Sequence, residues 1–243
     1  MIQVQCGLVR DSLNAILRRH MEKAWIAVLR KEALSELRLR SSLITAILFA
    51  VFSVVCISFA TYDLQISPQL GSGLLSLSML FAAVISLPRV MLVEVESKTI
   101  DLLRLMGNPG DVFWGKAIYN LIFMAFTSIV LTLLFLGFTH VGVGNYALLA
   151  ICMAGSSAAF AGTVTLCGAL VTHASNQTAL AGILSVPLLL PLSFLAVSGL
   201  RVALDVQGTF NAGNGMIAGL GLLSYGLATL AVGPYLFAVV WKR

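Results

Sequence analysis

Charged side chains are scarce in this sequence. Asp, Glu, Lys and Arg make up 10% of its 243 residues, while 59% of the residues are hydrophobic. An ordinary soluble domain carries roughly 25% charged residues. A soluble fold of this length has too little interior for so much apolar surface, because surface area shrinks slowly relative to size. The composition therefore excludes an ordinary soluble domain and indicates one compact domain embedded in a lipid bilayer, with no catalytic domain attached.

Ionisable residues are also missing from the middle of the long apolar stretches. Arg89, Glu94 and Arg201 stand only near the ends of such stretches. Transporters driven by protons or ions usually keep ionisable groups at membrane depth, where the coupling ion needs a ligand. This absence argues against an ion-driven transporter and fits a permease whose energy comes from another subunit.

Groupings typical of metal sites and active sites are absent as well. None of the four cysteines forms a C-x-x-C pair, so we interpret them as small buried residues. His20, His140 and His173 are scattered and are interpreted as interfacial polar residues, with a role as haem or metal ligands as the alternative. Neither a Ser/His/Asp arrangement nor a carboxylate pair stands out. We therefore expect no catalytic residue and no metal site, and the chain is not expected to be an enzyme.

One segment imitates a nucleotide-binding loop. Residues 110–117 read Gly-Asp-Val-Phe-Trp-Gly-Lys-Ala and match the pattern G-x-x-x-x-G-K. A working loop needs Ser or Thr after the lysine and a strand before the first glycine. Here Ala117 takes the place of the hydroxyl residue, and bulky Phe113 and Trp114 occupy the loop. We interpret Gly115 and Lys116 as the boundary of a membrane span and expect no ATP site there.

Six apolar stretches are long enough to cross a bilayer, which takes roughly 20 helical residues. All are predicted to be helices, because backbone exposed to lipid must satisfy its own hydrogen bonds. The sequence thus predicts an all-α, polytopic membrane protein in which residues 1–40 form an N-terminal segment and residues 41–243 a transmembrane domain. Small residues in the last three stretches predict close helix packing within one subunit. The predicted spans are residues 42–60, 71–93, 117–138, 146–171, 179–200 and 216–241.

The basic residues predict how the spans are oriented. Of the fifteen Lys and Arg residues, eight lie in the first forty residues and four more between Arg89 and Lys116. The first and third connections carry none. Because cations are retained on the cytoplasmic side, the N-terminus, the second connection and the C-terminus are predicted to lie inside. This clustering indicates an anionic lipid surface as partner and argues against nucleic acid.

The segment before the first span is predicted to form an interfacial helix. Residues 12–40 contain neither Pro nor Gly, and Ile26, Leu29, Ala33 and Leu37 recur at helical spacing. Such a helix can lie along the inner membrane surface. The alternative is a cytoplasmic helix without membrane contact. The segment lacks the apolar core and cleavage site of a secretory signal.

The second connection, about residues 94–116, is the most informative one. Its charged residues alternate with leucines and isoleucine, and Gly107 and Pro109 follow as helix-ending residues. A short amphipathic cytoplasmic helix of this kind can dock into a groove on a soluble partner. The alternative is a charged loop without a partner. The residues predicted to contact the partner are Glu94, Glu96, Asp101, Leu103 and Arg104.

Three stretches give the chain a resemblance to a known family. They are residues 25–40 with Arg30-Lys31-Glu32, residues 79–116, and the Val-Pro-Leu-Leu-Leu-Pro-Leu run at 186–192. The chain resembles permease subunits of ABC-2 type exporters, and more narrowly haem exporter protein B, the CcmB permease of cytochrome c maturation. The likeness covers most of residues 22–241, and the first twenty residues look like an extension.

The resemblance implies partners and a cargo. Family members work with a separate ATPase subunit, CcmA, which binds ATP, and with the haem-handling membrane protein CcmC. Haem enters as cargo and not as a resident cofactor, and the membrane is a bacterial-type cytoplasmic (inner) membrane or its organellar equivalent. A homodimer or a hetero-oligomer is compatible with this. Two alternatives stay open, namely an ABC-2 permease for a lipid, peptide or drug, and an assembly subunit without transport activity.

Overall fold

The structure is a computed structural model that describes residues 25–35, 41–62, 66–96, 108–171 and 177–241. Within these ranges the side chains of 41–43, 86–96, 177–179 and 240–241 are not described. All regular secondary structure in the described chain is helical, as predicted, with one helix at residues 25–35 and six longer ones. The longer helices are α2 (Ser41–Ala60), α3 (Pro68–Glu96), α5 (Pro109–Thr139), α6 (Tyr146–Leu170), α7 (Gln177–Ala203) and α8 (Ala212–Trp241).

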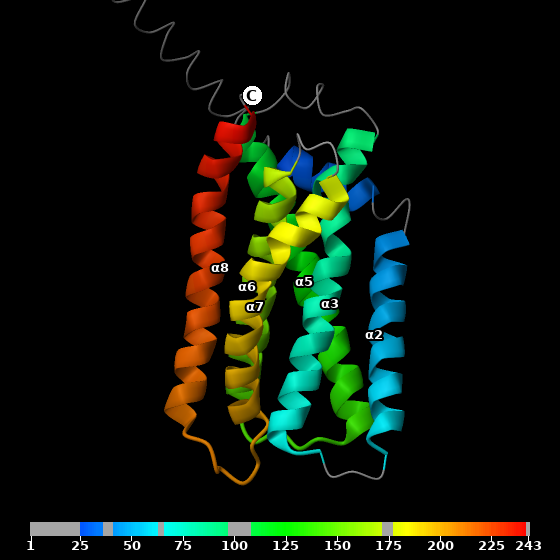
Figure 1. Cartoon of the computed structure of the whole chain (residues 1–243), viewed down its shortest axis with the longest axis vertical. Coiled ribbons are helices and arrows are strands. Elements are labelled where there is room, and N and C mark those ends of the chain that lie inside the picture. The colour runs from blue at the N-terminus through cyan, green and yellow to red at the C-terminus, as the bar shows by residue number, and fades with distance from the viewer. Residues whose placement is uncertain (1–24, 36–40, 63–65, 97–107, 172–176, 242–243) are drawn as a thin grey trace, which may run out of the picture.

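The six longer helices lie side by side in one bundle (Figure 1). Helix 25–35 lies at one end, together with the end of α3 and the start of α5 (Figure 1). We call this the charged end, because it carries Arg30, Lys31, Glu32 and Lys116. The opposite end holds residues 60–62, 66–68, 139–146 and 203–212, and we call it the far end (Figure 1). Successive long helices thus run in opposite directions (Figure 1).

Five of these helices are long and apolar enough to cross a membrane: Pro68–Ile85, Pro109–Thr139, Tyr146–Leu170, Leu180–Ala203 and Ala212–Val239. The remaining helix, α2, has 20 residues. Its apolar part among the described side chains is shorter and runs from Ile44 to Ala60. The protein is therefore a multi-pass helical membrane protein, in which α2 is the shortest candidate for a span.

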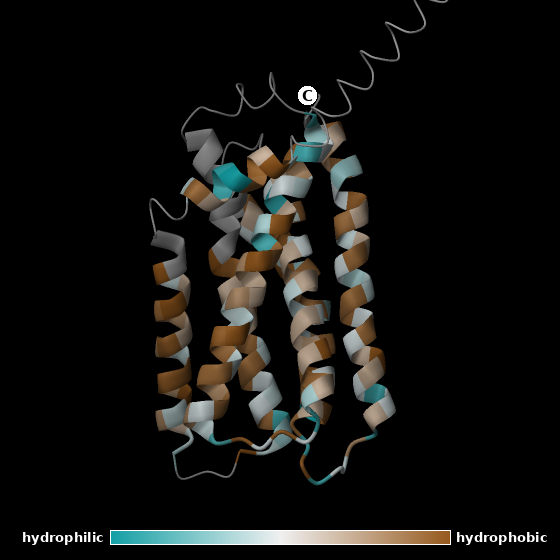
Figure 2. Ribbon diagram, turned by 180° about the vertical axis from the view of Figure 1, so that it is seen from behind, coloured by the Kyte–Doolittle hydropathy of each residue, from teal (hydrophilic) through white to brown (hydrophobic). Residues whose placement is uncertain are grey.

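The outer surface of the bundle is apolar, as a lipid-facing surface must be. Large hydrophobic side chains point outwards along its length, among them Phe52, Leu133 and Phe194, with exposed fractions of 71%, 67% and 74%. Figure 2 shows hydrophobic colours along the helices and hydrophilic ones gathered on helix 25–35 and near the ends of the bundle. A soluble monomer rarely exposes such a continuous apolar surface.

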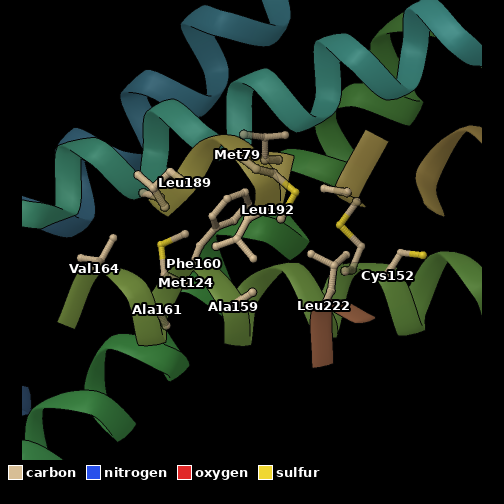
Figure 3. Packing of buried hydrophobic residues seen from close by; sticks show 14 of the residues in the cluster. Met79, Met124, Cys152, Ala159, Phe160, Ala161, Val164, Leu189, Leu192 and Leu222 are labelled. Carbon is tan, nitrogen blue, oxygen red and sulfur yellow. The ribbon is translucent and has the colours of Figure 1, made fainter. Parts of the chain in front are cut away.

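Helix α6 forms the centre of the bundle. Of its span, 72% is buried inside the protein, against 28–44% of the other four long spans. Figure 3 shows Phe160 of α6 beside Leu192 and Leu189 of α7, with Met79 of α3 close by. A helix surrounded by neighbours must be thin, and the small residues of α6 make it so. A Cβ atom on Gly162 would lie within 2.2 Å of the Thr229 hydroxyl of α8. The predicted packing within one subunit is confirmed.

Three helices carry prolines in their interior, with Pro88 inside α3. Pro187 and Pro191 stand inside α7 and Pro234 inside α8, yet neither helix ends there. In Figure 1 the first turns of α7 are inclined to the rest of the helix. Proline removes one backbone hydrogen bond and clashes with the preceding turn, so it bends a helix whose neighbours hold it in place.

Local signals fix the two ends of the connection between α5 and α6. Asn145 caps α6, since its side-chain oxygen accepts a hydrogen bond from the Leu148 N–H at 3.0 Å. His140 caps the end of α5 in a left-handed conformation with φ 52°, and its N–H donates to the Leu136 carbonyl. The connection is held against the end of α7, because the N–H groups of Gly144 and Asn145 donate to the Ala203 carbonyl.

Candidate functional site

At the charged end, helix 25–35 packs against the first turns of α5. The contact point is Gly115, where a Cβ atom would lie 2.7 Å from the Val28 side chain and 2.9 Å from the Trp25 carbonyl oxygen. Only glycine permits this approach without displacing the N-terminal helix. The two segments are therefore in direct backbone contact just after the predicted partner-docking connection.

An ion pair locks the same contact. The Lys116 ammonium donates a 3.0 Å hydrogen bond to Oε1 of Glu32, and Lys116 is only 3% exposed. Lys31 lies 3.8 Å from the same oxygen but is far more exposed. A buried cation is costly unless a partner neutralises it, so Lys116 fixes where Glu32 and its helix must sit.

Lys116 corrects one expectation from the sequence. Gly115 and Lys116 were predicted to mark the start of a span at residue 117, but α5 begins at Pro109. Proline is favoured at the first helical position because its missing N–H has no helical partner there. Lys116 therefore stands two turns inside α5, covered by protein. The look-alike of a nucleotide-binding loop, residues 110–117, is helical throughout, and its second glycine packs against Val28.

A buried amide, the side chain of Asn120, lies one turn further along α5. Asn120 is 2% exposed and donates to the Ala161 carbonyl and to the Thr165 hydroxyl of α6. Deeper in the bundle, Ser128 and Ser157 share a 2.9 Å hydrogen bond, and the Thr132 hydroxyl contacts the Met153 sulfur. These pairs tie α5 to the central helix α6. A movement at the start of α5 is thus passed to the core.

The outer side of helix 25–35 combines apolar and cationic groups. Ile26 and Leu34 are 45% and 54% exposed, and Arg30 and Lys31 stand exposed between them. The sequence predicts that Ile26, Leu29 and Ala33 share one apolar side of this helix. In the structure, Val28 and Glu32 mark the side that faces α5. The docking on α5 decides which side points outwards, and a sequence pattern alone could not reveal it.

The predicted partner-contacting residues fall at the edge of the described chain. Helix α3 continues through Glu94 and Glu96, so these two residues form its last turn and do not begin a separate helix. Asp101, Leu103 and Arg104 lie outside the described residues. Helix α5 begins at Pro109, seven residues before Lys116. The connection thus enters α5 directly ahead of the contact with helix 25–35.

The far end contains a pocket of about 480 Å³. The end of α2 contributes Ser58, Thr61 and Tyr62, and the end of α5 contributes Phe138, Thr139 and His140. The Ser58 hydroxyl donates to the Phe138 carbonyl at 3.2 Å and so joins the two helix ends. The sequence favours an interfacial role for His140 over a ligand role, because no sequence pattern brings residues 58–62 beside it.

A buried carboxylate orders the neighbouring connection between α7 and α8. Asp205 is 7% exposed and accepts hydrogen bonds from the N–H groups of Gln207 and Phe210 and from the Thr209 hydroxyl. Burial by itself raises the pKa of the Asp205 carboxyl, but these hydrogen bonds outweigh it and hold the pKa below its usual value. Arg201 packs over the Phe210 ring at 5.1 Å. Asp205 therefore shapes this connection as a fixed anion.

The bundle and its apolar surface define a multi-pass integral membrane protein. The family model described as CcmB protein matches residues 23–239, nearly the whole chain, and the chain therefore belongs to the CcmB protein family. Members of this family are membrane permease components of an ABC transporter in haem transport and cytochrome c biogenesis. No curated protein matches the sequence.

Proposed function

We propose that this chain is the membrane permease of an ABC transporter that handles haem for c-type cytochrome maturation. A separate ATPase subunit drives it, and a haem-handling membrane protein of the CcmC kind works beside it. The family supports the permease class, and the haem cargo follows from the family's role. In this proposal α2 is a sixth span, and the charged end faces the cytoplasm of a bacterial-type inner membrane or its organellar equivalent.

One observation carries the mechanical part of the proposal: the start of α5, which follows the predicted coupling connection in the chain, is held against helix 25–35. We call this contact of Gly115 and Lys116 with Val28 and Glu32 the clamp. The connection from Glu94 to Pro109 leads directly into α5, and Gly115 and Lys116 hold α5 against Val28 and Glu32. Pressure from an ATPase on the connection then acts on α5 at the point where helix 25–35 holds it. The polar pairs from Asn120 to Thr132 carry that movement into α6.

The exposed side of helix 25–35 anchors the clamp to the membrane surface. Ile26 and Leu34 can enter the boundary between headgroups and acyl chains, while Arg30 and Lys31 meet anionic headgroups. Held by the membrane on one side and by α5 on the other, the helix resists displacement. Movement of the connection is therefore transmitted to the helices of the bundle.

The coupling role of the connection is tested with Glu94→Ala and Asp101→Ala. In the purified complex, each variant is expected to lower the stimulated ATPase activity, because a charge at the docking surface is removed. Membrane insertion and yield should stay normal. Asp63→Ala, in the connection between α2 and α3, is the matched control and should behave as wild type. Unchanged coupled activity in both variants would refute this role for the connection.

The clamp is tested with two glycines of the same helix. Gly115→Ala places a Cβ atom 2.7 Å from Val28 and should loosen helix 25–35, with reduced ATPase coupling. Gly110→Ala meets nothing within 4 Å and should keep wild-type coupling. Protease accessibility of helix 25–35 should rise only in the first variant. Equal coupling in both variants contradicts the clamp.

A further inference from the structure

The far-end pocket has a feature that packing does not explain. His140 closes α5 at φ 52°, a conformation that costs a non-glycine residue on the order of 1–3 kcal/mol. Among the residues that the structure describes, His140 is the one non-glycine residue with a positive φ. Glycine would make the same backbone cap without strain. The cost indicates a use for the imidazole itself, and that imidazole lines the pocket.

The imidazole is available to a ligand. His140 is exposed, and within the described ranges no other group forms a hydrogen bond or ion pair with its ring. The nearby hydroxyls are already committed as donors: Ser58 to the Phe138 carbonyl, Thr61 to the Ile57 carbonyl and Thr139 to the Phe135 carbonyl. A neutral imidazole nitrogen is also a better ligand for iron than a hydroxyl oxygen, so His140 is the strongest electron-pair donor among the described residues of the pocket wall.

The other walls suit a flat aromatic molecule. Tyr62 and Phe138 flank the pocket and are 83% and 52% exposed, so their rings are free to pack against a planar face. The volume of about 480 Å³ lies within the roughly 300–1,000 Å³ typical of small-molecule sites. Since the pocket opens at the surface, a large planar ligand can enter it with one edge outside.

We propose that this pocket binds an iron porphyrin, with His140 as an axial ligand of the iron and Tyr62 and Phe138 against the macrocycle. Neutral imidazole is the commonest protein ligand of metals and a standard axial ligand of haem iron. This inference rests on the proposed function, which makes haem the cargo and places the far end on the delivery side. The pocket is then the place where the cargo is held outside the bilayer.

The test uses the full-length permease purified with its ATPase partner and titrated with ferric protoporphyrin IX. Wild type is expected to show saturable binding with an absorption spectrum of imidazole-ligated haem. His140→Gly keeps the left-handed cap without strain but lacks the ring. Its affinity should fall on the order of tenfold or more, since even loss of a group that orients a metal ligand costs 10–100-fold. Free imidazole should restore the ligated spectrum.

Two controls make the result specific. His173→Gly removes the histidine in the connection between α6 and α7 and should bind like wild type. Metal-free protoporphyrin IX should bind wild type and His140→Gly equally, because it has no iron to ligate. Equal affinity of both proteins for the iron porphyrin, or a wild-type spectrum without imidazole ligation, overturns the inference. The ATPase activity of wild type, measured without porphyrin in the same preparations, reports separately on the proposed function.

Discussion

At the scale of single residues, the buried charged side chains of the described chain each fix the position of a backbone segment. Lys116 positions helix 25–35 through Glu32, and Asp205 orders the connection between α7 and α8. In an apolar bundle such groups have few competing partners. Removing one therefore leaves another buried and unsatisfied, and this loss is larger than that of the contact itself.

Glu32→Gln is predicted to destabilise the protein by about 2–3 kcal/mol. This lies below the roughly 3–5 kcal/mol for a fully buried pair, because Glu32 keeps some contact with water. The buried Lys116 ammonium then loses the negative charge of Glu32. Lys116→Met is expected to cost less, since methionine is apolar and of similar length. Unfolding in detergent measures both, and a larger loss for Lys116→Met contradicts this reasoning.

The lowered pKa of Asp205 predicts how the stability of the protein depends on pH. Because its pKa is lower in the folded protein than in the unfolded chain, the carboxylate contributes stability above the unfolded pKa, about 3.9. That contribution is lost as the pH falls through the folded pKa. Asp205→Asn, which cannot titrate, should lose less stability than wild type below about pH 4. Thermal unfolding between pH 6 and pH 3 tests this, and parallel acid losses in both proteins would refute it.

At the scale of helices, close packing depends on glycines that face backbone. A Cβ atom on Gly226 of α8 would lie 2.8 Å from the Ala158 carbonyl carbon and 2.9 Å from the Ala159 nitrogen of α6. Backbone atoms cannot move aside, so the helices themselves must separate. The contact between α6 and α8 is therefore intolerant of even one extra carbon.

Gly226→Ala is predicted to destabilise the protein by about 1–3 kcal/mol, the usual cost of overpacking. Gly182→Ala in α7 meets nothing within 4 Å and should change the stability by less than about 1 kcal/mol, in the favourable direction for a helix. Unfolding of the two variants in the same detergent gives the comparison. Equal effects would show that α6 and α8 do not control stability.

The six helices could be predicted from the sequence because each is a long apolar run between polar segments. The start of α5 could not, since residues 109–116 contain charges and resemble a loop, yet Pro109 begins a helix there. The orientation of helix 25–35 also escaped prediction. It depends on Gly115, which lies some ninety residues along the chain from Val28, and one sequence carries no signal for such a pairing.

At the scale of the whole molecule, the two ends differ in chemistry. The charged end holds a clamp beside the predicted coupling connection, and the far end holds the pocket with His140. The resemblance to the CcmB family could be recognised from three sequence stretches and is confirmed over residues 23–239. The clamp and the pocket could not be predicted, because each joins residues that are distant in sequence. The account thus places energy input and cargo at opposite ends of one bundle.

The central claim is that a separate ATPase drives this permease. The most direct measurement is gentle purification of the tagged protein from its native membranes, followed by mass spectrometry of the proteins that accompany it. The account predicts an ABC ATPase together with haem-handling membrane proteins. An ATPase without them would keep the permease class but contradict the haem assignment. Finding no ATPase, under conditions that preserve a known ABC complex, would contradict the claim and favour an assembly subunit without transport activity.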